Sequence, residues 1–505
     1  LWLVHVDIAI RNLMNFSDSG NEYHVVIIGA GISGLATAAW LDAAGVKVLV
    51  LESAPYVGGV MHTERLDDFL IETGPNSLLE TTPHIGELIA LAGVQDQVVY
   101  PDGAGSKRYI LRHGKFFPLP TNPSAFLRTP LFSLRAKLRL LREPFIKPAP
   151  PETEESIAEF VRRRIGSEFL DYAINPFVAG VYAGDPARLS VRAAFPKLYG
   201  LEQNYGSLIR GAIRGRKERA ARAEKAKDRA RMLSFREGMG ALPAALHRRL
   251  GEKVQLGVSN VQISTAADQA LPFSLEKEEP DKMWRIAFKT TSNEKIWNEI
   301  YARHVVITAP AYHVPTLFSE GPARRLAALR DVVYAPVAVI ATGFRRKHVR
   351  HPLDGFGFLV PEKEQRNILG TLFNSTLFPN RAPEGRVLMT TFAGGMRQPT
   401  LVSREDRDLR QLVLEDLRDL LGISAAPDFI HIRRYQQAIP QYMIGHQRFL
   451  DLMDEIEREF PGLHFATNYR GGISVADCIK QAREMATKIK NLLKVTERES
   501  RIKII

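Results

Sequence analysis

The strongest pattern in the chain is an apolar run, a glycine turn and an alanine-rich segment between residues 24 and 51. The runs at residues 25–28 and 46–51 are apolar almost throughout instead of alternating, which is typical of strands buried on both faces. The segment between them has helical composition and ends at Gly45. The pattern therefore predicts a βαβ unit with parallel strands.

Other blocks along the chain carry different signals. Helical periodicity is strong over residues 152–164, within a Pro-rich and basic middle section that we expect to be helical. The tail repeats the opening pattern, with a strand-like run at 464–468, a glycine pair and a helical segment at 475–493, so both ends of the chain should build one domain. Short apolar runs separated by turn residues are typical of an antiparallel sheet, and they lie at residues 336–344, 355–360, 367–373 and 386–392.

These blocks predict an α/β protein with a Rossmann-like dinucleotide-binding domain, a second domain built on an antiparallel sheet, and a helical lobe. We assign residues 20–92, 233–312 and 440–495 to the first domain, 93–111 and 313–439 to the second, 112–205 to the helical lobe and 206–232 to a basic insert.

Composition narrows the classes of protein that fit this arrangement. The chain has 505 residues, 45% hydrophobic and 25% charged, which is ordinary for a globular protein able to bury a large ligand. Cys478 is the single cysteine, so neither a disulfide framework nor a cysteine-rich metal site can form. The sequence lacks the roughly 18 uninterrupted apolar residues of a membrane-spanning helix. We therefore expect a soluble or peripheral protein without a bound metal.

The net charge of +12 is concentrated in two stretches. Residues 128–147 carry +5 and residues 210–231 carry +7. The second stretch has almost no large apolar side chains and cannot bury a face, so we expect a solvated helix or a disordered segment. Residues 1–13 precede Met14 and have no signal-peptide pattern, and we expect them not to belong to the native protein.

Gly29, Gly31 and Gly34 form a GxGxxG turn between the first apolar run and the helical segment. In such turns the first glycine allows a tight bend, the second lets the backbone approach a pyrophosphate, and the third lets helix and strand pack closely. The amino terminus of the helix favours phosphate charge. Glu52 ends the next strand, 18 residues after Gly34, where it would accept hydrogen bonds from ribose hydroxyls. The turn in this context predicts a dinucleotide site.

A second glycine pair, Gly58-Gly59, follows Glu52 after a short segment. This form is typical of the two-dinucleotide-binding flavoproteins, in which the pair lets backbone amides approach the pyrophosphate and the flavin. We therefore predict FAD, bound non-covalently, in preference to NAD.

Five phrases of the sequence resemble the oxygen-dependent, FAD-containing protoporphyrinogen oxidase family, within the amine oxidase-like flavoproteins. The resemblance covers about residues 22 to 495, which is nearly the whole chain. The phrases are Gly74-Pro75-Asn76-Ser77, residues 175–186 (NPFVAGVYAGDP), 355–361 (GFGFLVP), 369–373 (LGTLF) and 468–475 (NYRGGISV).

The resemblance implies a membrane-associated oxidase of haem biosynthesis that converts protoporphyrinogen IX to protoporphyrin IX. Six electrons would leave this porphyrinogen substrate in three FAD cycles, each returned to dioxygen as hydrogen peroxide. Such chemistry requires positioning and exclusion of water more than a strong general base, so we assign no catalytic side chain. The resemblance also suggests a homodimer and hand-over of the product to ferrochelatase.

For the substrate, the resemblance implies that Arg108 pairs with a propionate, because a guanidinium offers a planar fork to a carboxylate. It implies that Leu359 and Leu372 enclose one pyrrole ring, that Phe392 stacks on another, and that Gly180 lies close to the macrocycle. The second domain is accordingly expected to bind the substrate.

For FAD, the resemblance implies contacts from the glycine turns, from Glu52 and from the start of the last helix, whose amino terminus would stabilise negative charge on the reduced flavin. Relatives often carry a basic residue soon after the Gly-Gly pair, whereas this chain has Val60, and no role is assigned there. The expected contacts are Gly29, Gly31, Ser33, Gly34, Glu52, Ser53, Gly58, Gly59, Gly74, Asn76, Val258, Gly472, Ile473, Ser474 and Val475.

A basic amphipathic segment in the helical lobe predicts a membrane-facing surface, because such helices bind anionic lipid. The alternative, a helix packed on its own domain, stays open. If the protein is bacterial, a membrane-facing surface predicts a cytoplasmic protein, peripheral on the inner face of the cell membrane. Leu131, Leu134, Leu138 and Leu141 share one helical face, with Arg135, Arg139 and Arg142 outside it.

Other functions stay open at this point. Coproporphyrinogen III oxidation to coproporphyrin III differs only in the substituents of the ring, and an amine oxidase or polyene desaturase would use the same cofactor domain. A flavin-binding protein without catalysis is the alternative from another class. Nucleic acid is not expected as a partner, because the basic residues 210–231 include no aromatic side chain to stack on bases.

Overall fold

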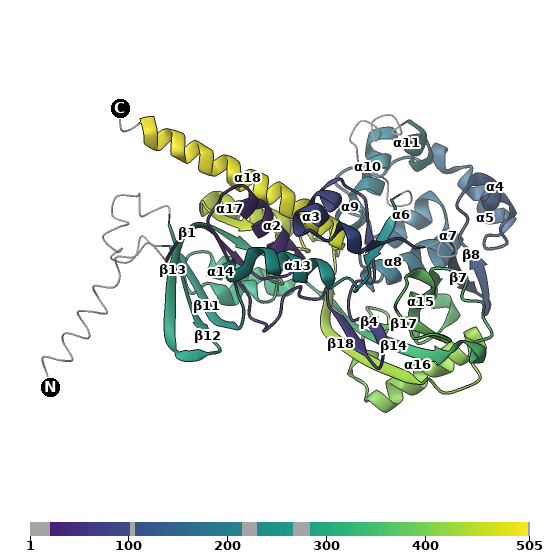
Figure 1. The fold of residues 1–505 in the computed structure, drawn as a ribbon. Coiled ribbons are helices and arrows are strands. Elements are labelled where there is room, and N and C mark those ends of the chain that lie inside the picture. Colours follow the sequence, from purple (N-terminus) through teal and green to yellow (C-terminus); the bar gives the residue numbers. More distant parts are fainter. Residues whose placement is uncertain (1–20, 102–106, 215–229, 266–282, 503–505) are drawn as a thin grey trace, which may run out of the picture.

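The structure of the chain, a computed structural model, describes residues 21–101, 107–214, 230–265 and 283–502, with side chains up to residue 494. Residues 1–13 and most of the predicted basic insert, 215–229, lie outside these described residues. The described part contains two large sheets, called here the first and the second sheet, and a helical lobe (Figure 1).

The first sheet confirms the predicted βαβ unit, because β1 and β2 are parallel and α2 connects them. β13 pairs with the other side of β1, and β19 pairs with β13, both in parallel. β19 and the helix α18 come from the tail, so the two ends of the chain meet here as expected. The elements are β1 (Glu22–Ile28), α2 (Ile32–Ala43), β2 (Val48–Leu51), β10 (Val254–Gln255), β11 (Val258–Thr265), β12 (Trp284–Thr290), β13 (Asn293–Ile307), β19 (Leu463–Phe465) and α18 (Val475–Ile502).

Alternate residues of the parallel strands enter two separate cores, which explains why their sequences are apolar throughout. Val25 and Ile27 of β1 pack with α2, α13 (Ala241–Leu250) and α18. Val26 and Ile28 pack on the other face, with β11, β12 and α17 (Gln447–Glu459). β11 and β12 are antiparallel, so the sheet is mixed.

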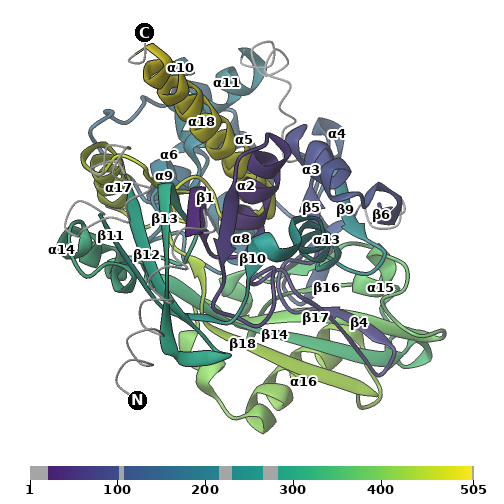
Figure 2. The same ribbon diagram turned by 60° about the vertical axis from the view of Figure 1, so that its left-hand side comes forward.

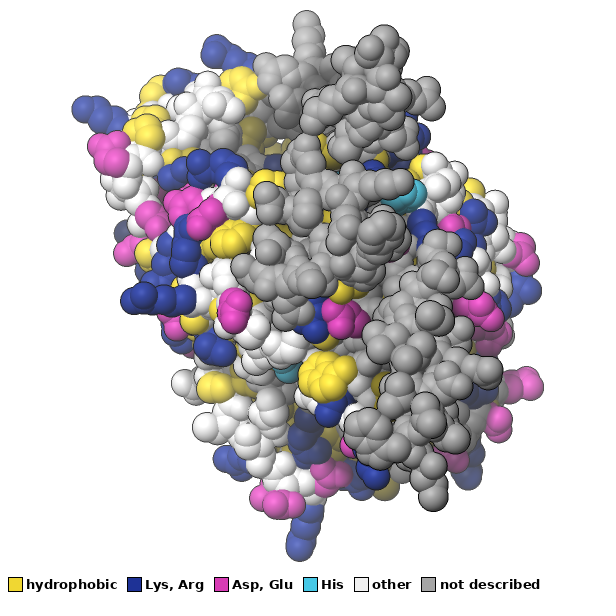
Figure 3. Space-filling model, turned by 90° about the vertical axis from the view of Figure 1, so that its left-hand side faces the viewer, with side chains coloured by type: hydrophobic (Ala, Val, Ile, Leu, Met, Phe, Trp, Pro, Cys, Tyr) yellow, Lys and Arg dark blue, Asp and Glu magenta, His cyan; other side chains and the backbone are white. Residues whose placement is uncertain are grey.

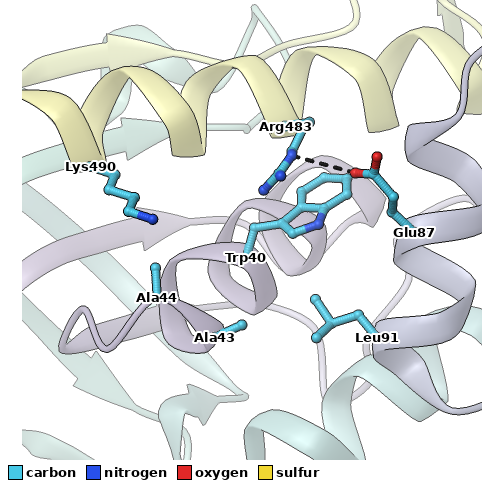
Figure 4. Close-up of a pocket in the computed structure, with 7 residues that line it drawn as sticks. All are labelled: Trp40, Ala43, Ala44, Glu87, Leu91, Arg483 and Lys490. Atoms are coloured by element: carbon cyan, nitrogen blue, oxygen red, sulfur yellow. Dashed lines mark ion pairs between the residues drawn. The ribbon is translucent and has the colours of Figure 1, made fainter.

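The long helix α18 packs on α2 through buried apolar side chains, and Figure 4 shows a polar cluster at this contact. The Arg483 guanidinium lies 5.4 Å from the centre of the Trp40 ring and forms a 3.6 Å ion pair with Glu87 of α3 (His84–Ala92). Figure 1 shows α18 starting near the centre of the molecule and running outward to the C-terminus. Its amino terminus is therefore anchored where the strands of the first sheet end.

The second sheet confirms the predicted strands at 336–344, 355–360, 367–373 and 386–392, and its order is β18-β14-β17-β16-β15-β7-β8. It is antiparallel except where β7 pairs with β15. The predicted domain boundary at residue 111 is wrong, because β8 lies beyond it and pairs with β7 in this sheet. The strands are β7 (Arg108–Arg112), β8 (Lys115–Pro118), β14 (Tyr334–Arg345), β15 (Gly357–Leu359), β16 (Ile368–Leu372), β17 (Arg386–Gly394) and β18 (Phe429–Pro440).

One face of the second sheet is covered by α16 (Asp406–Leu421), whose Leu409, Val413 and Leu417 are fully buried. The hairpin of β3 (Thr63–Leu66) and β4 (Phe69–Glu72) lies on the opposite face (Figure 2). Phe69 stacks there on Phe429 of β18, with ring centres 4.7 Å apart. The hairpin thus joins the chain around the glycine turns to the second sheet.

The middle of the chain is helical, as predicted. α6 begins at Ile157 and not at 152, because Ser156 and Glu159 form a capping box that fixes its start. Arg164, the last residue of α6, is fully buried and forms ion pairs with Glu143 and Glu202. The helices are α4 (Pro123–Arg128), α5 (Leu134–Leu140), α6 (Ile157–Arg164), α7 (Ser167–Phe169), α8 (Asn175–Tyr182), α9 (Val191–Ala194), α10 (Pro196–Tyr205) and α11 (Leu208–Arg214).

Small elements complete the described fold. A three-stranded sheet beside α3 has the order β5-β9-β6, and its central strand follows the basic insert. The elements are β5 (Leu78–Leu79), β6 (Val98–Val99), β9 (Met232–Phe235), α14 (Ala323–Leu326) and α15 (Asn374–Leu377). Figure 3 shows one face of the molecule. Where this face is coloured by side-chain type, basic and acidic side chains are interspersed, with no large block of one sign.

A half-buried and a buried histidine join the tail to the first sheet and predict a pH dependence of stability. His304 of β13 and His464 of β19 lie with Nδ1 and Nε2 3.1 Å apart, and burial lowers the pKa of His304 to about 4 and that of His464 to about 3. Unfolding returns both pKa values to about 6.5, so the unfolded chain binds more protons as the pH falls. The contribution of the two histidines to the unfolding free energy should therefore be fully present above pH 6.5. The unfolding free energy should decrease by about 2 kcal/mol or more as the pH falls towards 4.

His464→Gln should make this decrease shallower, because it removes one of the two titrating groups. Urea unfolding midpoints at pH 7, 5.5 and 4.5 measure the effect, with His247→Gln on the partly exposed side of α13 as the control. Equal slopes for His464→Gln and the wild type would exclude this role of the pair.

Candidate functional site

The glycine turn brings β1 and α2 so close that two of its glycines are required by packing alone. Gly29 has a φ of 110°, and its N–H donates to Leu51 O at 2.8 Å. A Cβ at Gly29 would lie 2.6 Å from Thr308 Oγ1, and one at Gly34 would overlap with Gly29 O. Neither position can carry a side chain without moving the backbone.

Gly31 differs, because a Cβ there would meet no atom within 4 Å. The second glycine pair lies opposite: Gly58 N–H donates to Ala30 O at 2.8 Å, and a Cβ at Gly59 would lie 3.6 Å from Gly31 Cα. Gly31 also begins α2, and no described side chain caps this helix. Open space between glycines at an uncapped helix amino terminus fits the pyrophosphate of FAD.

Glu52 is held rigidly at the end of β2. Its carboxylate accepts from Ala30 N–H at 2.6 Å and from Ala54 N–H at 2.9 Å, and Ser53 Oγ donates to it at 3.3 Å. Val258 N–H donates to the Glu52 carbonyl at 2.9 Å, so this predicted contact residue also supports the strand end. A fixed, half-buried carboxylate beside the cradle fits recognition of ribose hydroxyls.

The turn at Gly74 and Asn76 lies against the second glycine pair. A Cβ at Gly74 would overlap with the carbonyl oxygen of Val60, so Gly74 is required by backbone packing. The Asn76 side chain is buried; its Nδ2 donates to Gly74 O at 3.0 Å and its Oδ1 accepts from Asn374 Nδ2 at 2.6 Å. Asn374 follows β16, so this bond crosses from the cofactor cradle to the second sheet.

The predicted contacts at the start of α18 form one turn. Gly472 has a φ of 123°, and its N–H donates to the Tyr442 hydroxyl at 2.9 Å, which itself donates to Asn468 O at 2.7 Å. Ser474 Oγ accepts from Asp477 N–H at 3.2 Å and donates to the Asp477 carboxylate at 2.6 Å, which caps the helix before Val475. The turn is therefore fixed at both ends.

Ile473 and Ser33 connect this turn to its surroundings. Ile473 packs against the core of the first sheet and that of the helical lobe. Ser33 of α2 forms a hydrogen bond with the buried Cys478 of α18, and burial raises the pKa of that thiol to about 11. This bond joins α2 and α18 just beyond the cradle, so Ser33 has a structural partner besides its predicted cofactor.

Arg108, Leu359, Leu372 and Phe392 lie on one face of the second sheet, because directly paired residues of neighbouring strands point to the same side. This face is opposite to the one covered by α16. The first cross-strand row is Arg108, Gly357, Leu372, Thr390 and Ala341. The next row is Ile110, Leu359, Gly370, Phe392 and Val339.

Gly180 of α8 lies over this face, because a Cβ there would be 2.7 Å from Leu359 Cδ2. α8 is clamped to the sheet by Arg397, which donates to Asn175 Oδ1 at 2.6 Å and to Val360 O at 2.8 Å. Burial lowers the pKa of Arg397 to about 10. The structure thus brings together all five residues predicted for the substrate, Arg108 at the exposed edge and Gly180 above Leu359.

Sequence reasoning missed Asn374, Arg397 and Tyr442, which hold the predicted residues in place. Asn374 directly follows the LGTLF phrase, so its position was a usable signal. Arg397 and Tyr442 act through backbone carbonyls and amides distant in sequence, and no local pattern marks such partners.

The apolar side of α5 points outward. Leu134, Leu138 and Leu141 are 72%, 55% and 67% exposed, and Phe145 beyond them is 82% exposed. This excludes packing of that face on the protein's own domain. The expectation for Leu131 is wrong, because it precedes the helix and is fully buried. No described helix combines the length and apolarity needed to cross a bilayer.

The open space at Gly31 predicts separable effects of two substitutions. Gly31→Ala should fold with nearly unchanged stability but bind FAD about tenfold or more weakly, because the methyl group would occupy the approach of the pyrophosphate. Gly34→Ala should lose stability itself, because its methyl group overlaps with Gly29 O.

Titration of the apoprotein with FAD and thermal unfolding of the apoprotein measure the two effects. Gly86→Ala on α3, where a Cβ also meets nothing within 4 Å, is the matched control and should change neither. FAD affinity of Gly31→Ala equal to that of Gly86→Ala would place the pyrophosphate elsewhere.

Comparisons with known proteins show which family the chain belongs to. The family model of the flavin containing amine oxidoreductases matches residues 32–490. Protoporphyrinogen oxidase 2 of Arabidopsis thaliana is 34% identical over 90% of this chain and 91% of its own. Coproporphyrinogen III oxidase of Bacillus subtilis is 28% identical over 92% of this chain and 97% of its own.

A solved structure from Exiguobacterium sp., provisionally assigned as a protoporphyrinogen oxidase, matches with a TM-score of 0.73 and 25% identity. It covers 93% of this chain and 99% of its own. The chain belongs to the flavin containing amine oxidoreductase family and, within it, to the protoporphyrinogen oxidases.

Proposed function

We propose that this chain is an FAD-dependent oxidase that converts protoporphyrinogen IX to protoporphyrin IX, with dioxygen as the electron acceptor. The observation that carries the proposal is the apolar face of the second sheet beside the cofactor cradle. Leu359, Leu372 and Phe392 lie on it in adjacent rows, and Arg108 lies at its edge. A large apolar macrocycle with acidic substituents on one side fits this arrangement.

Bound FAD supplies the hydride acceptor of such a reaction and returns the electrons to dioxygen. The chain itself binds and orients the substrate: Arg108 can pair with a propionate, and the leucines and Phe392 exclude water from the apolar ring. Each cycle removes a hydride from a carbon bridge and a proton, which together reduce dioxygen to hydrogen peroxide. Over three cycles the three hydrides leave three bridges, two of the protons leave nitrogen, and the third leaves the fourth bridge through tautomerism of the pyrroles.

No carboxylate occurs in the two cross-strand rows that carry these residues. These rows continue on β18 with His431 beside Ala341 and Arg433 beside Val339. With no carboxylate in them, we propose that oxidation depends mainly on the position of the ring. The turn from Gly472 to Val475 would place the amino terminus of α18 near the flavin, where negative charge on the reduced ring is stabilised.

Flavin reduction tests the proposal directly. Protoporphyrinogen IX mixed anaerobically with the FAD-loaded protein should bleach the flavin absorbance, and air should restore it with porphyrin fluorescence and peroxide. Coproporphyrinogen III tests the alternative that the Bacillus subtilis relative represents. Bleaching by putrescine or a polyene, with neither porphyrinogen active, would contradict the proposal.

Arg108→Ala should raise the KM for protoporphyrinogen IX about tenfold and change kcat little, because a propionate contact lies far from the reacting bridge. Arg108→Lys should recover part of the loss, since a lysine keeps the charge but not the planar fork. Steady-state kinetics measure both, with Lys115→Ala on the same hairpin as the control. An unchanged KM for Arg108→Ala would remove this residue from the substrate site.

If the protein is bacterial, the proposal includes a peripheral position on the inner face of the cell membrane. It is supported by the exposed leucines of α5 and the basic residues of the same segment, a combination that anionic lipid binds. The homodimer and the hand-over of product to ferrochelatase stay predictions of the resemblance.

Replacement of Leu134, Leu138 and Leu141 by Ser should reduce sedimentation with anionic phospholipid vesicles at least tenfold, because each buried leucine contributes about 1.5–3 kcal/mol. Ile296→Ser on β13, 58% exposed in the wild type, is the control and should bind like the wild type. Equal sedimentation of both variants would exclude α5 as the lipid-binding face.

A further inference from the structure

Asn374 lies at the junction of the substrate face and the cofactor cradle. It is the first residue of α15, two positions after Leu372, and only 2% of it is exposed. Its Nδ2 donates to Asn76 Oδ1 at 2.6 Å, across 298 positions of the sequence. This bond joins the second sheet to the turn behind the second glycine pair.

Asn76 depends on this bond for its orientation. Its Nδ2 donates to Gly74 O at 3.0 Å, and Gly74 presses on the carbonyl oxygen of Val60 directly after Gly59. If the Asn76 amide turned over, its oxygen would face Gly74 O and its NH2 group would face the NH2 group of Asn374. Gly74 O and the Asn374 amide therefore select the same orientation of Asn76.

The side-chain oxygen of Asn374 lacks a hydrogen-bond donor in the part of the chain that the structure describes. This Oδ1 atom is buried. A buried amide oxygen left without a donor destabilises a protein, so its presence beside a ligand site indicates a donor that the ligand supplies. Flavins and porphyrinogens both carry ring N–H groups.

We infer that Asn374 is a positioning residue: its Nδ2 fixes the Asn76 amide at the junction, and its Oδ1 accepts an N–H group of a bound ring. The ring is the flavin or a pyrrole of the substrate. A contact of Asn374 with a pyrrole of the substrate rests on the proposed function. The orientation of Asn76 and a contact with the flavin do not depend on it.

The test uses the FAD-loaded protein with Asn374→Leu, which keeps the size of the side chain and removes both polar atoms. Asn374→Ser, which is too short to reach Asn76, replaces it if Asn374→Leu does not fold. Ser375→Ala is the matched control, because Ser375 is the next residue of α15 and its Oγ only accepts from Leu388 N–H at 3.0 Å. Thermal unfolding verifies that each variant is folded.

Two readouts separate the sources of the N–H group. If the ring is the flavin, Asn374→Leu should shift the flavin absorbance spectrum and weaken FAD binding by the apoprotein about tenfold, without any substrate present. If the ring is a pyrrole, the spectrum and FAD affinity should stay unchanged while the KM for the porphyrinogen rises about tenfold. Ser375→Ala should change none of these quantities.

A double-mutant cycle with Asn76→Ala tests the positioning itself. Each single variant removes the hydrogen bond between Asn76 and Asn374. The FAD affinity or the KM, whichever is affected, should therefore change about ten- to twentyfold in the double variant. Two independent sites would change it about hundredfold. The inference would be overturned if the effects of the two single variants multiply in the double variant. It would also be overturned if Asn374→Leu folds and has the flavin spectrum, FAD affinity and KM of the wild type. If no porphyrinogen is oxidised even by the wild type, the proposed function fails. A changed spectrum and weaker FAD binding in Asn374→Leu would then still support the inference, and unchanged values would overturn it.

Discussion

The structure depends on the close approach of backbone to backbone around the first glycine turn. Gly34 of α2 rests on the carbonyl oxygen of Gly29, and Gly29 rests on Thr308 at the end of β13. This approach brings the ends of β1 and β13 and the start of α2 together. Gly29 and Gly34 are closely packed, whereas the space at Gly31 between them remains open. A cofactor cradle thus results from packing that the fold requires in any case.

A second consequence is that distant parts of the chain meet at the cradle. β19 pairs with β13, which places the start of α18 beside α2, and the β3–β4 hairpin carries the chain from the second glycine pair to the second sheet. Polar contacts across these junctions are few and buried, as in the bonds of Asn76 with Asn374 and of Tyr442 with Gly472. Buried bonds of this kind specify one arrangement, because no water can replace a lost partner.

Sequence predicted the parts of this structure that local patterns determine. The βαβ unit, the glycine turns and the strands β14 to β17 follow from periodicity and turn chemistry, and family phrases placed Leu359, Leu372 and Phe392 on one face.

β18 was missed because its exposed edge carries polar side chains such as Arg433 and Gln436. β8 was assigned to the helical lobe because its short run precedes a Pro-rich segment, and only its pairing with β7 shows where it belongs. Arg397 illustrates a harder limit, because it binds carbonyl oxygens that any sequence would supply.

The helical lobe lies between the exposed leucines of α5 and the substrate face of the second sheet, two regions that are far apart in sequence. Beneath the exposed leucines of α5, Leu131 and Phe132 form a buried cluster with Phe169, and this cluster extends to Ile110 and Leu359 of the substrate face. An apolar region therefore continues from the outward side of the lobe to the residue that Gly180 contacts. Porphyrinogens have apolar rings that dissolve poorly in water, and apolar side chains around Leu359 suit such a ring. Exposure of the α5 leucines, which would be a liability in a freely soluble enzyme, is then consistent with the chemistry of the substrate.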